Sequence, residues 1–369
     1  MLFTIIIPVY NRAEKVKPTL ASVLAQTYRP LQVVLVDNDS SDDSLSVLQE
    51  FQSQHSADGF EVVVAQESHH TASATRNRGF AEAKGDWVLF FDSDDTMRPT
   101  LVESYRNAII QHSGTLDLVA TKACLHSLDG SLRNLPFFTT DLFANQILHS
   151  ILATQRYAVR REFFEEYGPW NSELFEWNDW ELGIRLLLGQ PRIAIVNQLL
   201  VDIYDSGAAS ITGTNFSDRI GRWEHVIDLV EQYMANSNHP EKERMLHLID
   251  FRRIVLAAHY AKEGKTEAAR ELYAPAYRRL AAGSPLRRLI LPLLYHISSK
   301  GLRGASRLAK CLIRNETTKC PIFRIRGKLV RKLKRQQLQA SEMPNDAKHH
   351  ASVLACKDAQ LGDSDVHTI

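Results

Sequence analysis

The chain has 369 residues, of which 44% are hydrophobic, and its formal net charge is +1. This length and composition suit one large folded domain or two. The longest late apolar run, residues 289–297, is too short to cross a bilayer and contains Pro292, which argues against a transmembrane protein.

The charge is distributed unevenly along the chain. Residues 285–335 contain 15 Lys and Arg against a single acid, whereas the rest contains 29 basic and 42 acidic residues. This pattern predicts an acidic globular body followed by a basic extension. The four cysteines show no CxxC spacing, which favours a reduced, cytoplasmic protein. The opening MLFTIIIPVYNR lacks a basic n-region and a cleavage site, so we expect a first strand there and not a signal peptide.

Apolar, β-rich runs alternate with helical patterns over the first third of the chain. The expected strands are residues 2–9, 31–37, 60–65, 87–92 and 118–121. The expected helices are residues 13–26, 41–55, 71–84 and 99–112. Strands that alternate with helices in this way predict an α/β fold with a mostly parallel sheet that helices cover on both faces.

The remaining two thirds are less regular at first and then helical. The last part of the run 173–189 has the apolar spacing of a helix, and a short strand is expected at residues 193–197. Helices are then expected at residues 217–234, 241–261 and 266–282. We therefore predict a domain at 1–214, a helical region at 215–284, basic amphipathic helices at 285–339 and a disordered tail at 340–369.

The most informative segment is WVLFFDSDDTMRP, residues 87–99. A short buried strand runs directly into Asp92, Asp94 and Asp95, and the carboxyl ends of strands are where open α/β sheets bind ligands. Crowded carboxylates repel one another, and their hard oxygen atoms suit Mn²⁺ or Mg²⁺ bridged to phosphate. The alternative is a solvated loop that caps the helix opening near Pro99.

Two other strand ends carry polar residues that suit a nucleotide. Pro8 removes a backbone donor at the end of the first strand, Tyr10 follows it, and Asn11 can cap the next helix. Asp37 and Asp39 follow the second strand, where a carboxylate can accept hydrogen bonds from a nucleobase or a ribose. Because these clusters share one sheet edge, a common site is favoured over separate caps.

The segment ASATRNRG, residues 72–79, adds a candidate phosphate contact. Its small residues let the backbone approach a ligand closely, and Arg76 offers a planar fork to phosphate or carboxylate. Asn77 follows it. The alternative is a solvated helix face.

Four segments in register resemble one enzyme family. TIIIPVYNR, VVLVDNDSSDDS, ATRNRGFAEAKGDWVLFFDSDD and FEWNDWELGIRLL together look like the inverting family-2 glycosyltransferases of the GT-A fold, over residues 1 to about 210. The resemblance implies a nucleotide-sugar binding half at 1–122 and an acceptor half, with the base, at 123–214. It implies a UDP-sugar donor, Mn²⁺ or Mg²⁺ as cofactor, and a glycan or lipid-linked acceptor in polysaccharide or cell-surface glycan biosynthesis.

The resemblance also implies roles for single residues. Asp37 would contact the base of the donor, Arg76 would line the donor site, and Asp92 and Asp94 match the Asp-x-Asp motif that holds metal and ribose, with Asp95 as a supporting partner. Asp179 matches the general base. The other expected substrate-binding residues are Pro8, Tyr10, Asn11, Asp39, Asn77 and Trp180.

The chemistry of such a transfer fits these roles. A divalent ion on the diphosphate stabilises the leaving group, and one carboxylate within ~3 Å of the acceptor hydroxyl takes its proton. Direct displacement inverts the anomeric carbon and needs no enzyme nucleophile. Asp179 lies between Trp177 and Trp180, which can stack on sugars; alternatively, Trp180, Ile184 and Leu187 are the buried stripe of a helix.

The sequence departs from the family pattern at two places. Asn178 stands where the family usually has an acid, and the segment 204–210 lacks the His that helps bind metal in many relatives. The third protein ligand stays open, with His126, His69 and His70 as remote candidates.

The basic helices at 285–339 predict peripheral binding to an anionic membrane surface on the cytoplasmic side. Nucleic acid is not expected as a partner, because no binding module accompanies the charges; a solvated tail is the other alternative. Two other function classes are a nucleotidyltransferase, which usually has a Gly-rich loop where PVYNR stands here, and a nucleotide-sugar-binding protein that has lost catalysis.

Overall fold

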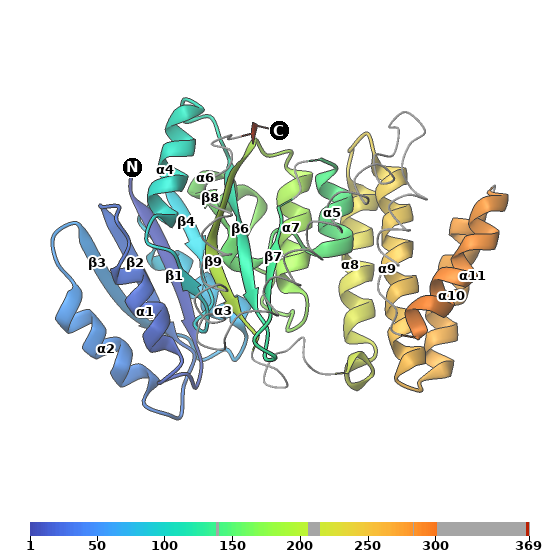
Figure 1. Ribbon diagram of the computed structural model, residues 1–369, viewed down its shortest axis with the longest axis horizontal. Coiled ribbons are helices and arrows are strands. Elements are labelled where there is room, and N and C mark those ends of the chain that lie inside the picture. The colour runs from blue at the N-terminus through green and yellow to red at the C-terminus, as the bar shows by residue number, and fades with distance from the viewer. Residues whose placement is uncertain (138–139, 206–214, 283, 301–366, 369) are drawn as a thin grey trace, which may run out of the picture. The chain divides into compact units, whose positions relative to one another are not determined.

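A mixed β-sheet forms the centre of the protein, as Figure 1 shows. This computed structural model describes residues 1–137, 140–205, 215–282, 284–300 and 367–368. By its contacts the chain divides into one unit of Met1–Ala305 with Asp365–Ile369 and a second unit, Ser306–Ser364, which lies outside the described residues. The basic helices expected beyond residue 300 therefore lie outside them too, as does the expected disordered tail apart from residues 367–368.

The sheet has the strand order β10-β9-β6-β8-β4-β1-β2-β3, with β5 paired to β9 and β7 paired to β6. Strands β1 to β4 run parallel, β8 runs antiparallel between β4 and β6, and β6 is parallel to most of β9. The predicted α/β fold with a mostly parallel sheet is confirmed. The strands are β1 (Phe3–Val9), β2 (Leu31–Asp37), β3 (Phe60–Gln66), β4 (Trp87–Phe90), β5 (Thr96–Met97), β6 (Leu118–His126), β7 (Leu132–Leu135), β8 (Tyr157–Arg160), β9 (Ile193–Tyr204) and β10 (His367–Thr368).

Helices cover both faces of the sheet and continue beyond it. Side chains of β1 such as Phe3, Ile5 and Ile7 belong to a core shared with α1, α2 and α4, whereas α3 packs against the opposite face. The helices are α1 (Val16–Leu24), α2 (Ser44–His55), α3 (Ala72–Glu82), α4 (Leu101–Gln111), α5 (Leu142–His149), η1 (Thr154–Arg156), α6 (Arg161–Tyr167), α7 (Asn178–Leu188), η4 (Phe216–Arg219), α8 (Arg222–Asn236), α9 (Lys242–Lys262), α10 (Thr266–Ala281) and α11 (Pro285–Ser299).

Gly79 lets α3 lie unusually close to the sheet. A Cβ atom at this position would lie 2.4 Å from Cγ2 of Ile6 on β1 and 3.0 Å from Cγ2 of Val36 on β2. Real Cβ atoms do not approach other atoms so closely, so only glycine allows this spacing. The close approach fixes where the rest of α3, including Arg76, meets the carboxyl ends of the strands.

The helices α8 to α11 stand beside α5 and α7, on the side of the sheet away from β3 (Figure 1). Helix α9 contacts α5, α8, α10 and α11, and α8 contacts α7. Helix α11 buries Leu291 and Leu294 but exposes Leu286, Leu289 and Leu293. Among the described residues, no helix is both long and apolar enough to cross a membrane.

Candidate active site

The loops after β1 and β2 meet at the carboxyl edge of the sheet. Val9 pairs with Asp37, so the two strands end side by side. The backbone N–H of Asn11 donates to Ser40 Oγ at 3.0 Å, and the Asn11 side-chain oxygen accepts from the backbone N–H of Ser41 at 2.8 Å. Asn11 and Asp39 both have positive φ, 48° and 57°, which Asn and Asp tolerate better than most residues. The two loops therefore form one hydrogen-bonded surface, and Pro8 lies beneath it, just beyond the last pairing of β1 with β4.

Asp37 presents a buried carboxylate oxygen without a partner. The residue is only 1% exposed, and its Oδ2 accepts a hydrogen bond from the backbone N–H of Ser40 at 3.1 Å. Its Oδ1 is buried and has no hydrogen-bond partner among the described residues. A buried acceptor in this state costs free energy unless a donor satisfies it, so a ligand N–H or O–H is the natural complement.

Tyr10, Asp39 and His70 form a more exposed rim. Tyr10 is 53% exposed, and its ring centroid lies 6.2 Å from that of His70. The His70 Nε2 lies 3.6 Å from Asp39 Oδ2. Because these three side chains are exposed and not packed in the core, they can contact a ligand without a rearrangement of the fold.

Arg76 joins α3 to the acidic loop after β4. Its Nη2 donates to Asp92 Oδ1 at 2.7 Å, and its guanidinium lies over the Trp170 ring, 4.5 Å from the centroid. The side chain is 7% exposed, yet its Nε and Nη1 have no hydrogen-bond partner among the described residues. Unsatisfied guanidinium donors beside a carboxylate suit a further oxyanion such as phosphate.

Asp94 and Asp95 are held where their negative charge is costly. Burial, and then the charge of Asp92, raise the pKa of Asp94, against the opposing charges of Arg12 and Lys15. Burial raises the pKa of Asp95 to about 8, with the Asp92 charge acting in the same direction. Asp95 accepts from the backbone N–H of Tyr204 at 2.9 Å and from the Gln155 side chain, so it is committed to the protein, whereas Asp94 is only half-buried.

Asp179 lies in the first turn of α7 and is coupled to the groups just described. Its Oδ1 accepts the backbone N–H of Trp180 at 2.8 Å. Burial raises the pKa of Asp179, and the charge of Asp92 adds to this, whereas the charges of Arg76 and Arg252 oppose it. The charges of Arg76 and Asp92 thus act on the pKa of Asp179, although more than eighty residues separate each of them from Asp179 in the sequence.

The loop that leads to α7 is tied to α3 by hydrogen bonds. Thr71 Oγ1 donates to the Ser172 carbonyl at 3.2 Å, and Ser73 Oγ donates to the Leu174 carbonyl at 3.4 Å. The Asn77 amide donates to the Trp170 carbonyl at 2.8 Å and accepts from the Trp170 backbone N–H at 3.0 Å. The nitrogen and the oxygen of the Asn77 amide thus each make one hydrogen bond within the protein, and its role as a substrate contact stays a prediction.

Trp180 differs from expectation. Its ring is completely buried, and its indole N–H donates to the Ile147 carbonyl at 3.1 Å. Together with Ile184 and Leu187 it forms the buried stripe of α7, so it is not placed to stack on a sugar.

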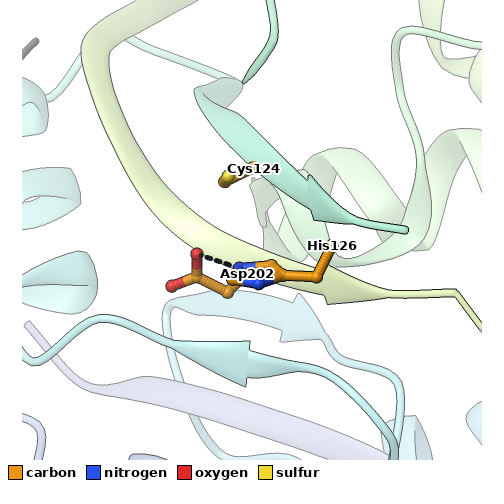
Figure 2. Close-up of side chains that lie close together, drawn as sticks. All are labelled: Cys124, His126 and Asp202. Carbon is orange, nitrogen blue, oxygen red and sulfur yellow. Dashed lines mark hydrogen bonds and ion pairs between the residues drawn. The ribbon is translucent and has the colours of Figure 1, made fainter. Parts of the chain in front are cut away.

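Three possible metal ligands meet between β6 and β9, next to the acidic loop, since Asp202 pairs with Thr96 on β5. Figure 2 shows Cys124, His126 and Asp202, which each place one ligand atom within 4.8 Å of the others. His126 Nε2 lies 2.9 Å from Asp202 Oδ1, and Arg98 binds both Asp202 oxygens, at 3.1 and 3.2 Å. Because a guanidinium already neutralises this carboxylate, Arg98, His126 and Asp202 are better described as a polar network near the end of β9, with Cys124 close to it. Of the remote candidates for a third ligand, His126 is engaged here, His70 lies at the rim, and the His69 carbonyl accepts from Asn38 at 2.9 Å.

Two residues of this region carried no recognisable signal in the sequence. Tyr157 on β8 has a buried hydroxyl without a partner among the described residues, and burial and the Asp179 charge raise its pKa. Arg252 on α9 lies over the rings of Trp177 and Trp180. Neither belongs to a motif, because each reaches the site through tertiary packing alone.

Comparison with known proteins places these features in context. Residues 4–168 match the model of the family described as glycosyl transferase family 2, a match that ends before Asp179. An uncharacterised glycosyltransferase of Nostoc sp. is 26% identical over 250 residues, which cover 63% of this chain and 74% of that protein. The structure of Staphylococcus aureus TarS residues 1–349 in complex with UDP-GlcNAc aligns with a TM-score of 0.63 at 19% identity, over 84% of this chain and 90% of that one. A mannosyltransferase from Pyrobaculum calidifontis, in complex with GDP-Man and Mn²⁺, aligns with a TM-score of 0.51 at 17% identity, over 84% and 86%. At such identities the two structures establish the fold.

Proposed function

We propose that this chain transfers a sugar from a UDP-sugar to a hydroxyl group with inversion of the anomeric carbon, and that the transfer depends on Mn²⁺ or Mg²⁺, because residues 4–168 match the model of glycosyl transferase family 2. The observation that carries the proposal is the set of hydrogen bonds by which Thr71 and Ser73, at the start of α3, hold the loop before Asp179, while Arg76 on the same helix pairs with Asp92 at 2.7 Å. It brings a half-buried carboxylate from the second half of the domain to the end of β4, where the leaving group of a donor would lie.

The donor base would bind at the end of β2. The unpartnered Oδ1 of Asp37 is an acceptor that the N–H of a uracil ring would satisfy. The loop of Asn11 and Ser40 would line the same pocket, and Tyr10 is exposed enough to cover the base. These contacts are similar before and during the reaction, so they would set donor affinity more than the rate of the chemical step.

The diphosphate would lie between Arg76 and the acidic loop. Asp94 and Asp92 would hold the divalent ion. Burial, and then the charge of Asp92, raise the pKa of Asp94, so a cation beside these two carboxylates would favour their ionised forms. When bound, such an ion stabilises the negative charge of the leaving diphosphate. Arg76, with two unsatisfied guanidinium nitrogens, would contribute a second positive charge from the protein side.

Asp179 would act as the general base for the acceptor. Only one hydrogen bond from the described residues reaches its carboxylate, from the Trp180 backbone N–H, so oxygen lone pairs are left for an acceptor hydroxyl. Its raised pKa suits a group that must take a proton during the reaction. No covalent intermediate is needed, so the product would carry the inverted configuration.

The acceptor side would lie at an anionic membrane. The exposed residues Leu286, Leu289 and Leu293 recur at i, i+3 and i+7 on α11, and Arg287 and Arg288 lie beside them. A stripe of this kind next to a basic block suits peripheral binding to an anionic lipid surface. A lipid-linked glycan would reach the site from there, in the synthesis of a polysaccharide or cell-surface glycan.

The proposal is tested with a panel of UDP-, GDP- and TDP-sugars. We expect nucleotide release to be highest with a UDP-sugar, to need Mn²⁺ or Mg²⁺, and to fall by about 10²-fold or more in Asp179→Asn. Calorimetric binding of UDP should be nearly unchanged in that variant. A product with retained anomeric configuration would exclude the single-displacement mechanism.

A further inference from the structure

The C-terminal helices hold the amino end of α7, where Asp179 lies. Glu176 is buried and pairs with Arg219 at 2.8 Å and with Arg222 at 3.4 Å. Trp177, the residue before α7, has a positive φ of 48° and contacts the rings of Phe216 and Trp223, with centroids 6.2 and 4.7 Å away. A left-handed Trp is a strained conformation that surrounding contacts must stabilise.

Arg252 on α9 completes this environment. Its guanidinium carbon lies 4.1 Å from the centroid of the Trp177 ring and 4.9 Å from that of Trp180. Its Nη1 donates to the Ile147 carbonyl at 3.0 Å, the same oxygen that accepts the Trp180 indole N–H at 3.1 Å. One cation thus touches both tryptophans that flank Asp179 in the sequence, and a carbonyl of α5 fixes its position.

No hydrogen bond joins Arg252 to the Asp179 carboxylate among the described residues, yet their charges interact. The interaction raises the pKa of Arg252 against a larger effect of burial, which lowers it to about 10, so the guanidinium stays charged at neutral pH. A positive charge that is close but not hydrogen-bonded favours the ionised carboxylate without occupying its lone pairs. An ordinary salt bridge would occupy the oxygen that an acceptor hydroxyl needs.

We propose that Arg252 is a positioning residue for the reaction: its charge, held between Trp177 and Trp180, keeps Asp179 ionised and fixes the amino end of α7. This inference rests on the proposed role of Asp179 as general base. It extends the site to α9, a helix that lies beyond residues 4–168.

The test compares pH profiles of Arg252→Met and Arg252→Lys with wild type, using UDP-GlcNAc hydrolysis at saturating Mn²⁺. The titratable and charged groups that act on Asp179 are Arg76 from α3, Asp92 after β4, the neutral Tyr157 from β8 and Arg252 from α9, with His259 beside Arg252. Removing one cation raises the pKa of Asp179, so the acidic limb of kcat/KM should move up by about one pH unit in Arg252→Met. The rate should fall about tenfold below the limb and approach wild type above it, with KM for UDP-GlcNAc within about twofold. Arg252→Lys should keep the wild-type limb.

Arg253→Met is the matched control. Arg253 is the next residue on α9, but its guanidinium pairs with Asp228, Glu231 and Asp250, away from Asp179. Its loss should lower the melting temperature and leave the acidic limb in place. An unchanged limb in Arg252→Met, or an equal shift in Arg252→Lys, would overturn the proposal.

A measurement without substrate separates this inference from the proposed function. Trp177 and Trp180 flank Asp179, so tryptophan emission should follow its ionisation, with a pH midpoint that is absent in Asp179→Asn. That midpoint should rise in Arg252→Met and not in Arg253→Met. If Asp179→Asn keeps full turnover, the base role fails; if the midpoint does not rise in Arg252→Met, the Arg252 inference fails whatever Asp179 does.

Discussion

Asp37 illustrates how a single buried oxygen can be read as a ligand contact. The carboxylate is held by Ser40 on one side and leaves Oδ1 unsatisfied on the other. In Asp37→Asn one oxygen becomes a donor and the charge is lost, so KM for the nucleotide sugar should rise by about 10- to 100-fold, the equivalent of one charged hydrogen bond. The value of kcat should change much less.

Steady-state kinetics at varied donor concentration measures this effect. Asp58→Asn is the control, because Asp58 is exposed and lies just before β3, at the opposite end of the parallel strands. A loss confined to kcat would contradict the assignment of Asp37 to the donor base.

Asp94 should act only through a metal ion. In Asp94→Ala we expect nucleotide release to fall about 100-fold or more, as several kcal/mol of charge stabilisation are lost. Calorimetry should find that Mn²⁺ strengthens UDP binding to wild type but not to the variant, and that both bind alike in chelator. Asp129→Ala, which removes an exposed carboxylate, is the control. Wild-type turnover that survives excess chelator would refute the metal role.

The sequence predicted that the polar loops after the strands meet at one edge of the sheet, because parallel strands end at the same edge and their loops carry the ligand contacts. The contacts of Asn77 and Trp180 could not be predicted from the sequence. The Asn77 amide is hydrogen-bonded to the backbone of residue 170, and no local sequence pattern predicts a contact between residues 93 positions apart. For Trp180 the sequence left open a sugar contact and a buried helix stripe, and the packing of α5 and α8 against α7 buries its ring completely.

At the scale of elements, Gly79 sets the distance between α3 and the sheet. Gly79→Ala would improve helix propensity, but its Cβ would overlap Ile6, so we expect the free energy of unfolding to fall by ~1–3 kcal/mol. Urea denaturation measures this change. Ile6→Ala removes the nearest clashing methyl group, so the cost of Gly79→Ala should be smaller in that background. A stabilising Gly79→Ala would show that α3 can move away freely.

The long strands and the helices between them could be predicted because their patterns are regular, and β2 begins and ends where the sequence indicated. The expected strand at 193–197 instead continues to Tyr204. A β-bulge explains the difference: Thr121 pairs with Val196 and Lys122 with Leu199, so Asn197 and Gln198 interrupt the apolar pattern without ending the strand. The short strands β5 and β8 depend on pairing with β9 and with β4 and β6, which a local pattern cannot reveal.

At the scale of the whole molecule, α11 is the helix that we propose to bind an anionic membrane surface. Leu289 is 76% exposed, and Leu289→Glu should weaken sedimentation with anionic liposomes because it places a negative charge in the apolar stripe. Leu128→Glu is the matched control, since Leu128 is 73% exposed but lies in the loop between β6 and β7. Binding should also weaken at ~1 M salt, where the Debye length is about 3 Å. Equal sedimentation of the two variants, or preference for nucleic acid, would reject the membrane surface as partner.

The contacts of α8 and α9 with the amino end of α7 affect which parts of such proteins can be exchanged in a chimera. The proposed donor contacts lie on α3 and the strand ends, whereas the partners of Glu176 and Trp177 lie at residues 216–252. A chimera that joined residues 1–205 to the C-terminal helices of another transferase would keep every donor contact. It would nonetheless lose the aromatic and cationic partners of Trp177, and the turn that carries Asp179 would relax. On the proposed roles, we therefore expect that donor recognition could be transferred with the sheet, whereas the proton-accepting step would also need the original C-terminal helices.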